Sequence, residues 1–160
     1  MAITRMNHAV LYVRDAARSA TFYRDVLGFR TVMEFPGGSF LQAPGSTNDH
    51  DIAFFTIGAA AGPSAAGRST VGLYHLAWEV ATLADLVDLR SRLQAEGALV
   101  GASDHGGTKS LYAQDPDGLE FEVCWVVPAD LLDPDVKIGT RPLDLESELA
   151  RFGADTPGGR

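Results

Sequence analysis

Apolar and polar positions follow the same order in two stretches of this chain. The first stretch, "HAVLYVRDAARSATFYRDVLGFRTV", begins at His8, and the second, "HLAWEVATLADLVDLRSRLQAEGALV", begins at His75. Each stretch opens with an alternating segment, which predicts a strand, and continues with apolar residues at helical spacing. A shared order of this kind indicates an internal repeat, so we expect two copies of one structural unit.

Each predicted helix has a start signal and a stop signal. Asp15 and Thr82 are residue types that favour the N-cap position, and Gly28 and Gly97 suit the end of each helix. Extended segments follow in both copies, "SFLQA" and "DIAFFTI" in the first and "SLYAQ" and "EFEVCWV" in the second. The pattern of each copy is therefore β-α-β-β-β.

The two copies predict the organisation of the whole chain. We expect a first βαβββ module at residues 1–57, a Gly/Pro-rich connector at 58–70, a second βαβββ module at 71–128 and a C-terminal arm at 129–160 with one short helix near Leu143–Arg151. One module alone exposes an apolar sheet face. Two modules side by side predict an α+β fold, in which a curved mixed sheet of about eight strands surrounds a central cavity and the helices lie outside.

Composition and charge restrict the partners of the chain. Its net charge is −8 and its Lys and Arg residues are scattered, which argues against nucleic acid and against an anionic membrane surface. No apolar run approaches the roughly 18 residues that cross a bilayer, and the N-terminus lacks a signal-peptide pattern, so we expect a cytoplasmic protein. The single cysteine, Cys124, excludes an intrachain disulfide and a zinc site built from cysteines.

Two of the four histidines, His8 and His75, begin the matching strands. Alternation places His8 on one face with Val10 and Tyr12, and it places His75 on the equivalent face of the second copy. The repeat therefore predicts that a pseudo-twofold axis relates His8 to His75. Two histidines arranged in this way can converge on one metal ion.

The last hairpin of the chain predicts a third ligand. "DPDG" at Asp115–Gly118 is a strong turn signal, and the three-residue loop that it predicts sets Tyr112 opposite Glu122. Glu122 alternates with Phe121 and Val123, which are apolar and should face the helices. The Glu122 carboxylate is therefore expected to point into the cavity, with the Tyr112 phenol beside it.

The first copy offers no fourth ligand, because Ala53 occupies the position that matches Glu122. A site made of His8, His75 and Glu122 leaves about three positions open on an octahedral ion, an arrangement suited to Fe(II) oxygenases. Mn(II) accepts the same ligand set, so the pattern predicts a three-ligand site for Fe(II) or Mn(II) with room for two small reactants.

These features resemble a known superfamily. The paired βαβββ pattern, "FYRDVLGF" in the first copy and "DPDGLEFEV" in the second are similar to the vicinal oxygen chelate superfamily, which includes glyoxalases, bleomycin- and fosfomycin-resistance proteins and extradiol dioxygenases. The resemblance covers residues from about 4 to 128. Its motifs are specific for the superfamily but not for one reaction.

The order of the histidines resembles one branch, the extradiol dioxygenases of the catechol 2,3-type. Their order is metal His, catalytic His, metal His, second-sphere His, Tyr and metal Glu, which is matched here in turn by His8, His50, His75, His105, Tyr112 and Glu122. The resemblance implies that His50 is the catalytic acid–base residue, that Tyr112 binds a substrate oxygen and that His105 helps to anchor it. His50 lies just before its strand, so alternation alone does not orient it.

The resemblance implies an Fe(II)-dependent extradiol dioxygenase, with Mn(II) as the alternative metal, that cleaves a small catechol-type aromatic substrate with O2 and forms a homodimer. Four aromatic residues are candidates to shape a ring-sized pocket, although sheet alternation assigns some of them to the core instead: Phe40, Phe54, Trp78 and Trp125. A glyoxalase-type metal-dependent lyase or isomerase is the first alternative, although such sites usually carry a carboxylate or glutamine where this chain has Ala53. A metal-free resistance protein that binds an aromatic antibiotic is the second, and the intact ligand set argues against it.

Overall fold

The computed structural model describes residues 2–67 and 69–159, and the chain divides into two compact units. These are unit 1, with Met1–Ser64 and Pro116–Gly118, and unit 2, with Ala65–Asp115 and Leu119–Arg160. Each unit contains a four-stranded sheet. The short turn Pro116–Gly118 groups with unit 1, where the Asp117 carboxylate pairs with the Arg14 guanidinium at 2.6 Å.

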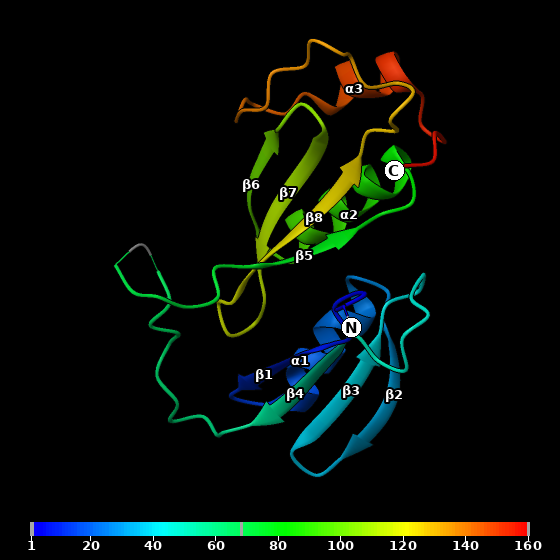
Figure 1. Ribbon diagram of the computed structural model, residues 1–160. Coiled ribbons are helices and arrows are strands. Elements are labelled where there is room, and N and C mark those ends of the chain that lie inside the picture. Colours follow the sequence, from blue (N-terminus) through cyan, green and yellow to red (C-terminus); the bar gives the residue numbers. More distant parts are fainter. Residues whose placement is uncertain (1, 68, 160) are drawn as a thin grey trace. The chain divides into compact units, whose positions relative to one another are not determined.

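The sheet of unit 1 follows the βαβββ order. Its elements are β1 (Ala9–Val13), α1 (Ala16–Asp25), β2 (Arg30–Phe35), β3 (Gly38–Gln42) and β4 (Ile52–Thr56). The strand order is β1-β4-β3-β2, with β1 parallel to β4 and the other pairs antiparallel. Helix α1 lies against one face of the sheet (Figure 1), where the buried rings of Tyr23 and Phe54 pack with their centroids 4.9 Å apart.

Unit 2 repeats this order and adds a helix in the C-terminal arm. Its elements are β5 (Leu76–Glu79), α2 (Leu83–Ala95), β6 (Leu99–Asp104), β7 (Thr108–Gln114), β8 (Glu120–Val126) and α3 (Leu145–Phe152). The strand order is β5-β8-β7-β6, with β5 parallel to β8. Helix α2 covers one face of the sheet (Figure 1), and the fully buried Trp125 contacts Phe152 of α3 with ring centroids 5.3 Å apart.

The predicted α+β class and the paired βαβββ order are confirmed. The strands form two four-stranded sheets, whereas we expected one curved sheet of about eight strands. The reason is that β1 pairs only with β4 and β5 only with β8 within the described residues, so each strand order ends there. The central cavity between the modules stays a prediction.

Side chains at the predicted N-caps hold the first turns of α1 and α2. Asp15 accepts hydrogen bonds from the backbone N–H groups of Ala17 and Arg18. Thr82 forms a capping box with Asp85, in which each side chain accepts the other residue's backbone N–H. Both start signals are therefore confirmed, because each cap satisfies N–H groups that have no partner inside the helix.

The β7–β8 hairpin has the predicted register. Tyr112 pairs with Glu122, and the backbone N–H of Asp115 donates to the Leu119 carbonyl at 3.0 Å. Gly118 has a φ of +81°, a left-handed conformation that glycine adopts without steric cost. The loop length matters because a shift of one residue would move Glu122 to the opposite face of the sheet.

The two faces of each sheet differ in burial. On β1, Val10 and Tyr12 are 51% and 74% exposed, whereas Val13 is 1% exposed. On β8, Phe121 and Val123 are buried, as their predicted orientation toward the helix requires. The open face of each sheet is therefore the one to which alternation assigns the candidate site residues.

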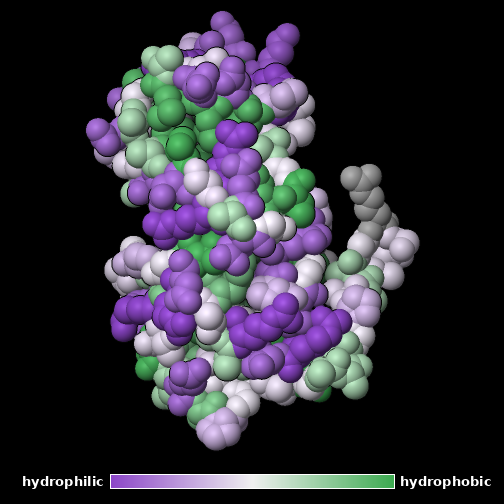
Figure 2. Space-filling model, turned by 180° about the vertical axis from the view of Figure 1, so that it is seen from behind, coloured by the Kyte–Doolittle hydropathy of each residue, from purple (hydrophilic) through white to green (hydrophobic). Residues whose placement is uncertain are grey.

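The outer surface mixes residue types. On the face of the molecule in Figure 2, hydrophilic and hydrophobic residues are interspersed. Some exposed charges pair locally, as Arg92 and Asp88 do at 2.7 Å on α2. No helix in the described ranges combines the length and the apolar content that a membrane crossing requires.

Candidate functional site

The histidine that precedes β1 lies against a second histidine. His8 and His50 stack with their ring centroids 4.4 Å apart and their planes inclined by 30°. They meet because β1 and β4 are parallel neighbours, and each residue lies just before its strand. Nδ1 of His8 is 2.6 Å from Oδ1 of Asn7, and an amide oxygen only accepts hydrogen bonds. Nδ1 therefore carries the hydrogen, and the Nε2 lone pair is left for a metal.

Asp49 and Phe40 contact other sides of His50. Oδ1 of Asp49 lies 3.3 Å from His50 Nδ1 and accepts the His50 backbone N–H at 2.9 Å. That backbone hydrogen bond holds the pKa of the Asp49 carboxyl below its usual range, so the group is ionised at neutral pH. The ring of Phe40 packs edge-on against His50, with centroids 5.0 Å apart. His50 Nε2 is buried and has no hydrogen-bond partner among the described residues, which leaves it available to a ligand.

In unit 2, the parallel strands β5 and β8 bring His75 next to Glu122. Nε2 of His75 lies 3.1 Å from Oε2 of Glu122, and both side chains are mostly buried. The register explains this contact, because Glu122 pairs with Ala77, two residues after His75 on the same face. One imidazole nitrogen and one carboxylate oxygen thus lie together on the open face of the sheet.

Tyr112 lies beside this pair. It pairs with Glu122 across the hairpin, and its ring is edge-on to that of His75, with centroids 5.9 Å apart. Burial, and after it the neighbouring Glu122 carboxylate, raises the pKa of the Tyr112 phenol above its ordinary value. The phenol therefore keeps its proton at neutral pH and is available as a hydrogen-bond donor.

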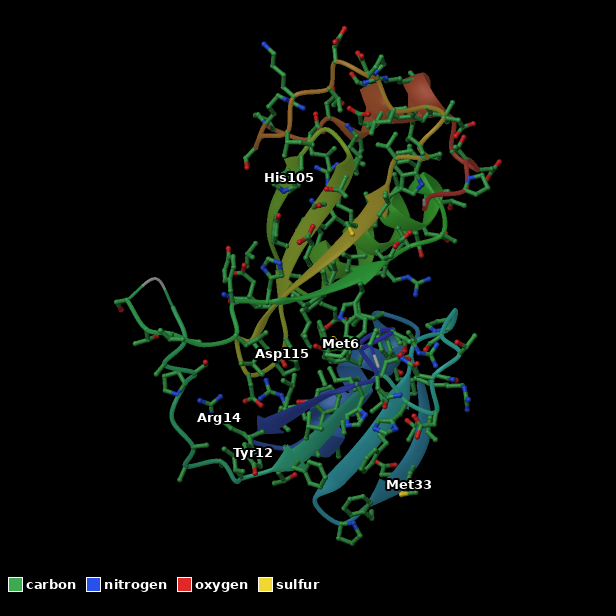
Figure 3. The ribbon with its side chains drawn as sticks, in the orientation of Figure 1. Met6, Tyr12, Arg14, Met33, His105 and Asp115 are labelled. Carbon is green, nitrogen blue, oxygen red and sulfur yellow. The ribbon has the colours of Figure 1, made fainter. Side chains whose placement is uncertain are left out.

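His105 connects Tyr112 to the C-terminal arm. Its Nε2 lies 2.8 Å from the Tyr112 hydroxyl, and its Nδ1 lies 2.9 Å from the backbone carbonyl of Gly139. Figure 3 shows His105 at the end of β6, next to the arm. The structure therefore groups the predicted site residues in two sets, one in unit 1 and one in unit 2: His8 and His50, and His75, His105, Tyr112 and Glu122.

Ala53 takes the place that Glu122 has in unit 2. Val10, two residues after His8, pairs with Ala53, just as Ala77, two residues after His75, pairs with Glu122. Ala53 is fully buried and brings no polar atom to the first histidine. The matching registers therefore make Ala53 the counterpart of Glu122, and unit 1 has no carboxylate at this position.

The donor atoms of unit 2 fit a divalent metal ion. Two donors at neighbouring positions of an octahedral ion, each about 2.1 Å from it, lie about 3.0 Å apart. The 3.1 Å between His75 Nε2 and Glu122 Oε2 matches that spacing. Within the part of the chain that the structure describes, no three His, Cys, Asp or Glu side chains gather closely enough to hold an ion. The third predicted ligand, His8, belongs to unit 1.

Some residues near the site have structural roles. Phe54 and Trp125 are fully buried in the cores of units 1 and 2, so they do not line a pocket, whereas Phe40 contacts His50. Burial, reinforced by the charge of Glu122, raises the pKa of the Cys124 thiol to about 11. Cys124 is therefore a protonated thiol at neutral pH in the metal-free protein.

Four neighbours of the site escaped the sequence analysis, namely Asn7, Asp49, Tyr74 and Gly139. Tyr74 packs on His75 with ring centroids 4.6 Å apart, although it lies outside the alternating segment. Asn7 and Asp49 each directly precede a histidine of the predicted site. This adjacency is the only feature of the sequence that could have indicated them. Gly139 contacts His105 through its backbone carbonyl, which no residue type could have indicated.

The chain is similar in sequence to known proteins. Residues 5–123 match the sequence profile of the Glyoxalase/Bleomycin resistance protein/Dioxygenase superfamily. The chain is 36% identical over 125 residues to biphenyl-2,3-diol 1,2-dioxygenase 3 of Rhodococcus globerulus. This match covers 74% of the chain and 62% of that protein. The chain is also 31% identical over 123 residues to catechol-2,3-dioxygenase of Bacillus subtilis (strain 168). This second match covers 75% of the chain and 41% of that protein. The chain thus spans less than two thirds of the length of either relative.

A solved structure shows the same fold. The glyoxylase/bleomycin resistance protein/dioxygenase domain from Frankia sp. EAN1pec superposes with a TM-score of 0.65. The match covers 80% of this chain and 96% of that domain, at 22% sequence identity. At this identity the likeness shows the fold, and the chemistry has to be argued from the residues of the site.

Proposed function

The chain belongs to the glyoxalase/bleomycin resistance protein/dioxygenase superfamily, and from this premise we propose that it is an extradiol ring-cleaving dioxygenase. The proposed reaction cleaves a small catechol-type aromatic substrate with O2. One observation carries the proposal, the joint placement of His75, Glu122 and Tyr112 on the open face of the unit 2 sheet. The curated relatives named as dioxygenases of aromatic diols support it.

The metal ligands in this proposal are His8, His75 and Glu122. Nε2 is the free donor of His8, because Asn7 accepts the hydrogen on Nδ1. Nε2 of His75 and Oε2 of Glu122 lie at the spacing of two donors to one ion. The ion, proposed to be Fe(II) with Mn(II) as the alternative, supplies Lewis acidity and redox chemistry with dioxygen.

His50 is the proposed acid–base residue. The Asp49 carboxylate lies 3.3 Å from Nδ1 and favours a hydrogen on that nitrogen, so Nε2 keeps its lone pair. Nε2 is also the buried atom that has no hydrogen-bond partner among the described residues. It can accept the proton of a catechol hydroxyl and return it later in the reaction.

Tyr112 and His105 are proposed to act on a substrate oxygen. The phenol is protonated at neutral pH and donates either to His105 Nε2 or to the substrate. A substrate oxygen that becomes anionic is the stronger acceptor, because hydrogen bonds to charged groups are stronger than those to neutral groups. Tyr112 would therefore stabilise the deprotonated catechol, and His105 would hold the phenol in place before deprotonation.

The absence of a carboxylate at Ala53 argues against glyoxalase-type chemistry, which usually uses a fourth protein ligand from the first module. Purification without oxygen, loading with Fe(II) and a panel of catechols test the two ideas together. We expect oxygen uptake and a yellow ring-fission product. Failure to bind any divalent metal contradicts the proposal. Bound metal without oxygen uptake on any catechol, but with turnover of a thiol hemithioacetal, supports a glyoxalase-type lyase instead.

Removal of the Glu122 charge tests the ligand set. Glu122→Gln should lose most of the bound metal and the ring-cleaving activity, because a neutral amide is a much weaker ligand than a carboxylate. Metal content is measured by elemental analysis after desalting. Glu120→Gln is the matched control, since it removes the same charge from the same strand next to the turn, and it should keep both properties. Full metal content in Glu122→Gln would rule Glu122 out as a ligand.

A further inference from the structure

The C-terminal arm pairs with the end of β6 beside the candidate site. Asp104 and Arg141 form an antiparallel bridge, with the Asp104 N–H donating to the Arg141 carbonyl at 2.9 Å and the reverse hydrogen bond at 3.0 Å. In Figure 1 this part of the arm runs alongside the β6–β7 turn. The residue after Asp104 is His105, so the bridge fixes the arm directly next to a site residue.

A buried lysine links the end of β6 to α3 of the arm. Lys109 is 2% exposed, and its ammonium group lies 2.6 Å from Asp104 and 3.2 Å from Glu148 of α3. Burial alone would raise the pKa of Asp104, but the hydrogen bonds from Lys109 and from the Gly106 N–H outweigh it and hold the pKa below its usual range. Asp104 is therefore ionised at neutral pH. A buried lysine needs such partners, so the position of α3 and the position of the β6–β7 turn depend on one another.

The arm also packs closely on the turn itself. Gly106 has a φ of +85°, and a Cβ atom there would lie 2.8 Å from Val136 Cγ2 and 3.1 Å from the Lys137 carbonyl. Arg141 adds two further contacts, to the Asp104 carboxylate at 3.3 Å and to the Lys137 carbonyl at 3.1 Å. The segment from Val136 to Arg141 is thus held on both sides of Gly139.

This packing decides which nitrogen of His105 carries a hydrogen. The Gly139 carbonyl, 2.9 Å from Nδ1, has no hydrogen to give, so Nδ1 must be the donor. In a neutral imidazole, Nε2 is then an acceptor, and the hydroxyl of Tyr112 at 2.8 Å donates to it. Thr140 Oγ1 is farther from Nδ1, at 3.5 Å, and adds little.

We propose that the C-terminal arm is a positioning element for Tyr112, acting through the Gly139 carbonyl and the Nδ1–H form of His105. The arm holds His105 with its Nε2 as an acceptor, and this acceptor keeps the Tyr112 hydroxyl in place until an anionic substrate oxygen takes over its hydrogen bond. The effect of this positioning role on turnover rests on the proposed function. The hydrogen-bond direction itself does not, because it is a property of the metal-free protein.

Nitrogen-15 NMR of the imidazole rings in metal-free protein tests the proposal. A free histidine side chain prefers the Nε2–H form. Hydrogen on Nδ1 of wild-type His105 would therefore show that the arm determines its tautomer. Arg141→Pro removes the bridging N–H and the side-chain contacts of Arg141, and should convert a large fraction of His105 to the Nε2–H form. Lys137→Ala, which removes a charge from the same segment but keeps the carbonyl that Arg141 contacts, should match the wild type. Hydrogen on Nε2 in the wild type, or an Arg141→Pro spectrum identical to it, overturns the proposal.

A double-mutant cycle tests the consequence for turnover. Arg141→Pro should lower kcat/KM on a catechol by about 10-fold, the lower end for partners that orient a site group, and should have almost no effect when Tyr112 is already Phe. An equal loss in both backgrounds would mean that the arm does not act through Tyr112.

If the wild type cleaves no catechol but His105 has the expected form, the proposed function fails and the positioning role stands. If catechol is cleaved while His105 is Nε2–H, the positioning role fails and the function stands.

Discussion

The surroundings of His50 differ on each side of its ring. Asp49 lies 3.3 Å from Nδ1, His8 stacks on one face, and Phe40 packs edge-on. Of these three neighbours only Asp49 brings a carboxylate to the ring, and it lies beside Nδ1. This is the arrangement expected of a histidine that must keep one nitrogen free to exchange a proton.

The role of His50 can be separated from metal binding. His50→Ala should keep the metal, because the proposed ligands remain, and should lower kcat by about 10²–10⁴-fold, the usual contribution of a general acid–base group. Metal content and oxygen uptake are measured on the same sample. Asp49→Asn should give a smaller loss, since the imidazole remains. Turnover equal to the wild type in His50→Ala would remove His50 from the mechanism.

At the scale of elements, the sequence predicts the parts that short-range rules control. The "DPDG" loop sets the β7–β8 register, and that register places Tyr112 opposite Glu122. The same reasoning identifies Ala53 as the counterpart of Glu122, which the β1–β4 pairing supports. These features were predictable because loop length and period-two alternation depend only on neighbouring residues.

Other contacts could not be predicted because they depend on tertiary packing. The arm before α3 has no hydrophobic period, and its contact to His105 comes from a backbone carbonyl. His50 lies outside its strand, so only the fold brings its ring against His8 and Phe40. The division of the strands into two sheets likewise depends on long-range pairing, which the repeat pattern does not specify.

The capping box of α2 gives a prediction at the scale of one element. Thr82→Ala should lower the free energy of unfolding by about 1 kcal/mol, because the Asp85 N–H loses its acceptor. Thr82→Ser keeps the hydroxyl and should restore most of that loss. Urea unfolding followed by circular dichroism measures both. A Thr82→Ala variant as stable as the wild type would mean that the cap does not hold the helix.

At the scale of the whole molecule, the residues proposed to act in the reaction belong to two units. His8 and His50 come from unit 1, and His75, Tyr112 and Glu122 come from unit 2. The two relatives named as dioxygenases match this chain over 62% and 41% of their own length. The observations that support it are the donor pair of β5 and β8, the phenol beside it and the free nitrogen of His50.

Ring cleavage by a dioxygenase inserts both atoms of one O2 molecule into the product. The most direct test is therefore turnover of a catechol by the Fe(II)-loaded protein under ¹⁸O2, with the ring-fission product analysed by mass spectrometry. We predict product that carries both labelled atoms, after allowance for exchange with water, and about 10²–10⁴-fold slower formation of that product when His50 is replaced by Ala. Unlabelled product, or no ring-opened product from any catechol by a protein that has bound its metal, would contradict the proposed function.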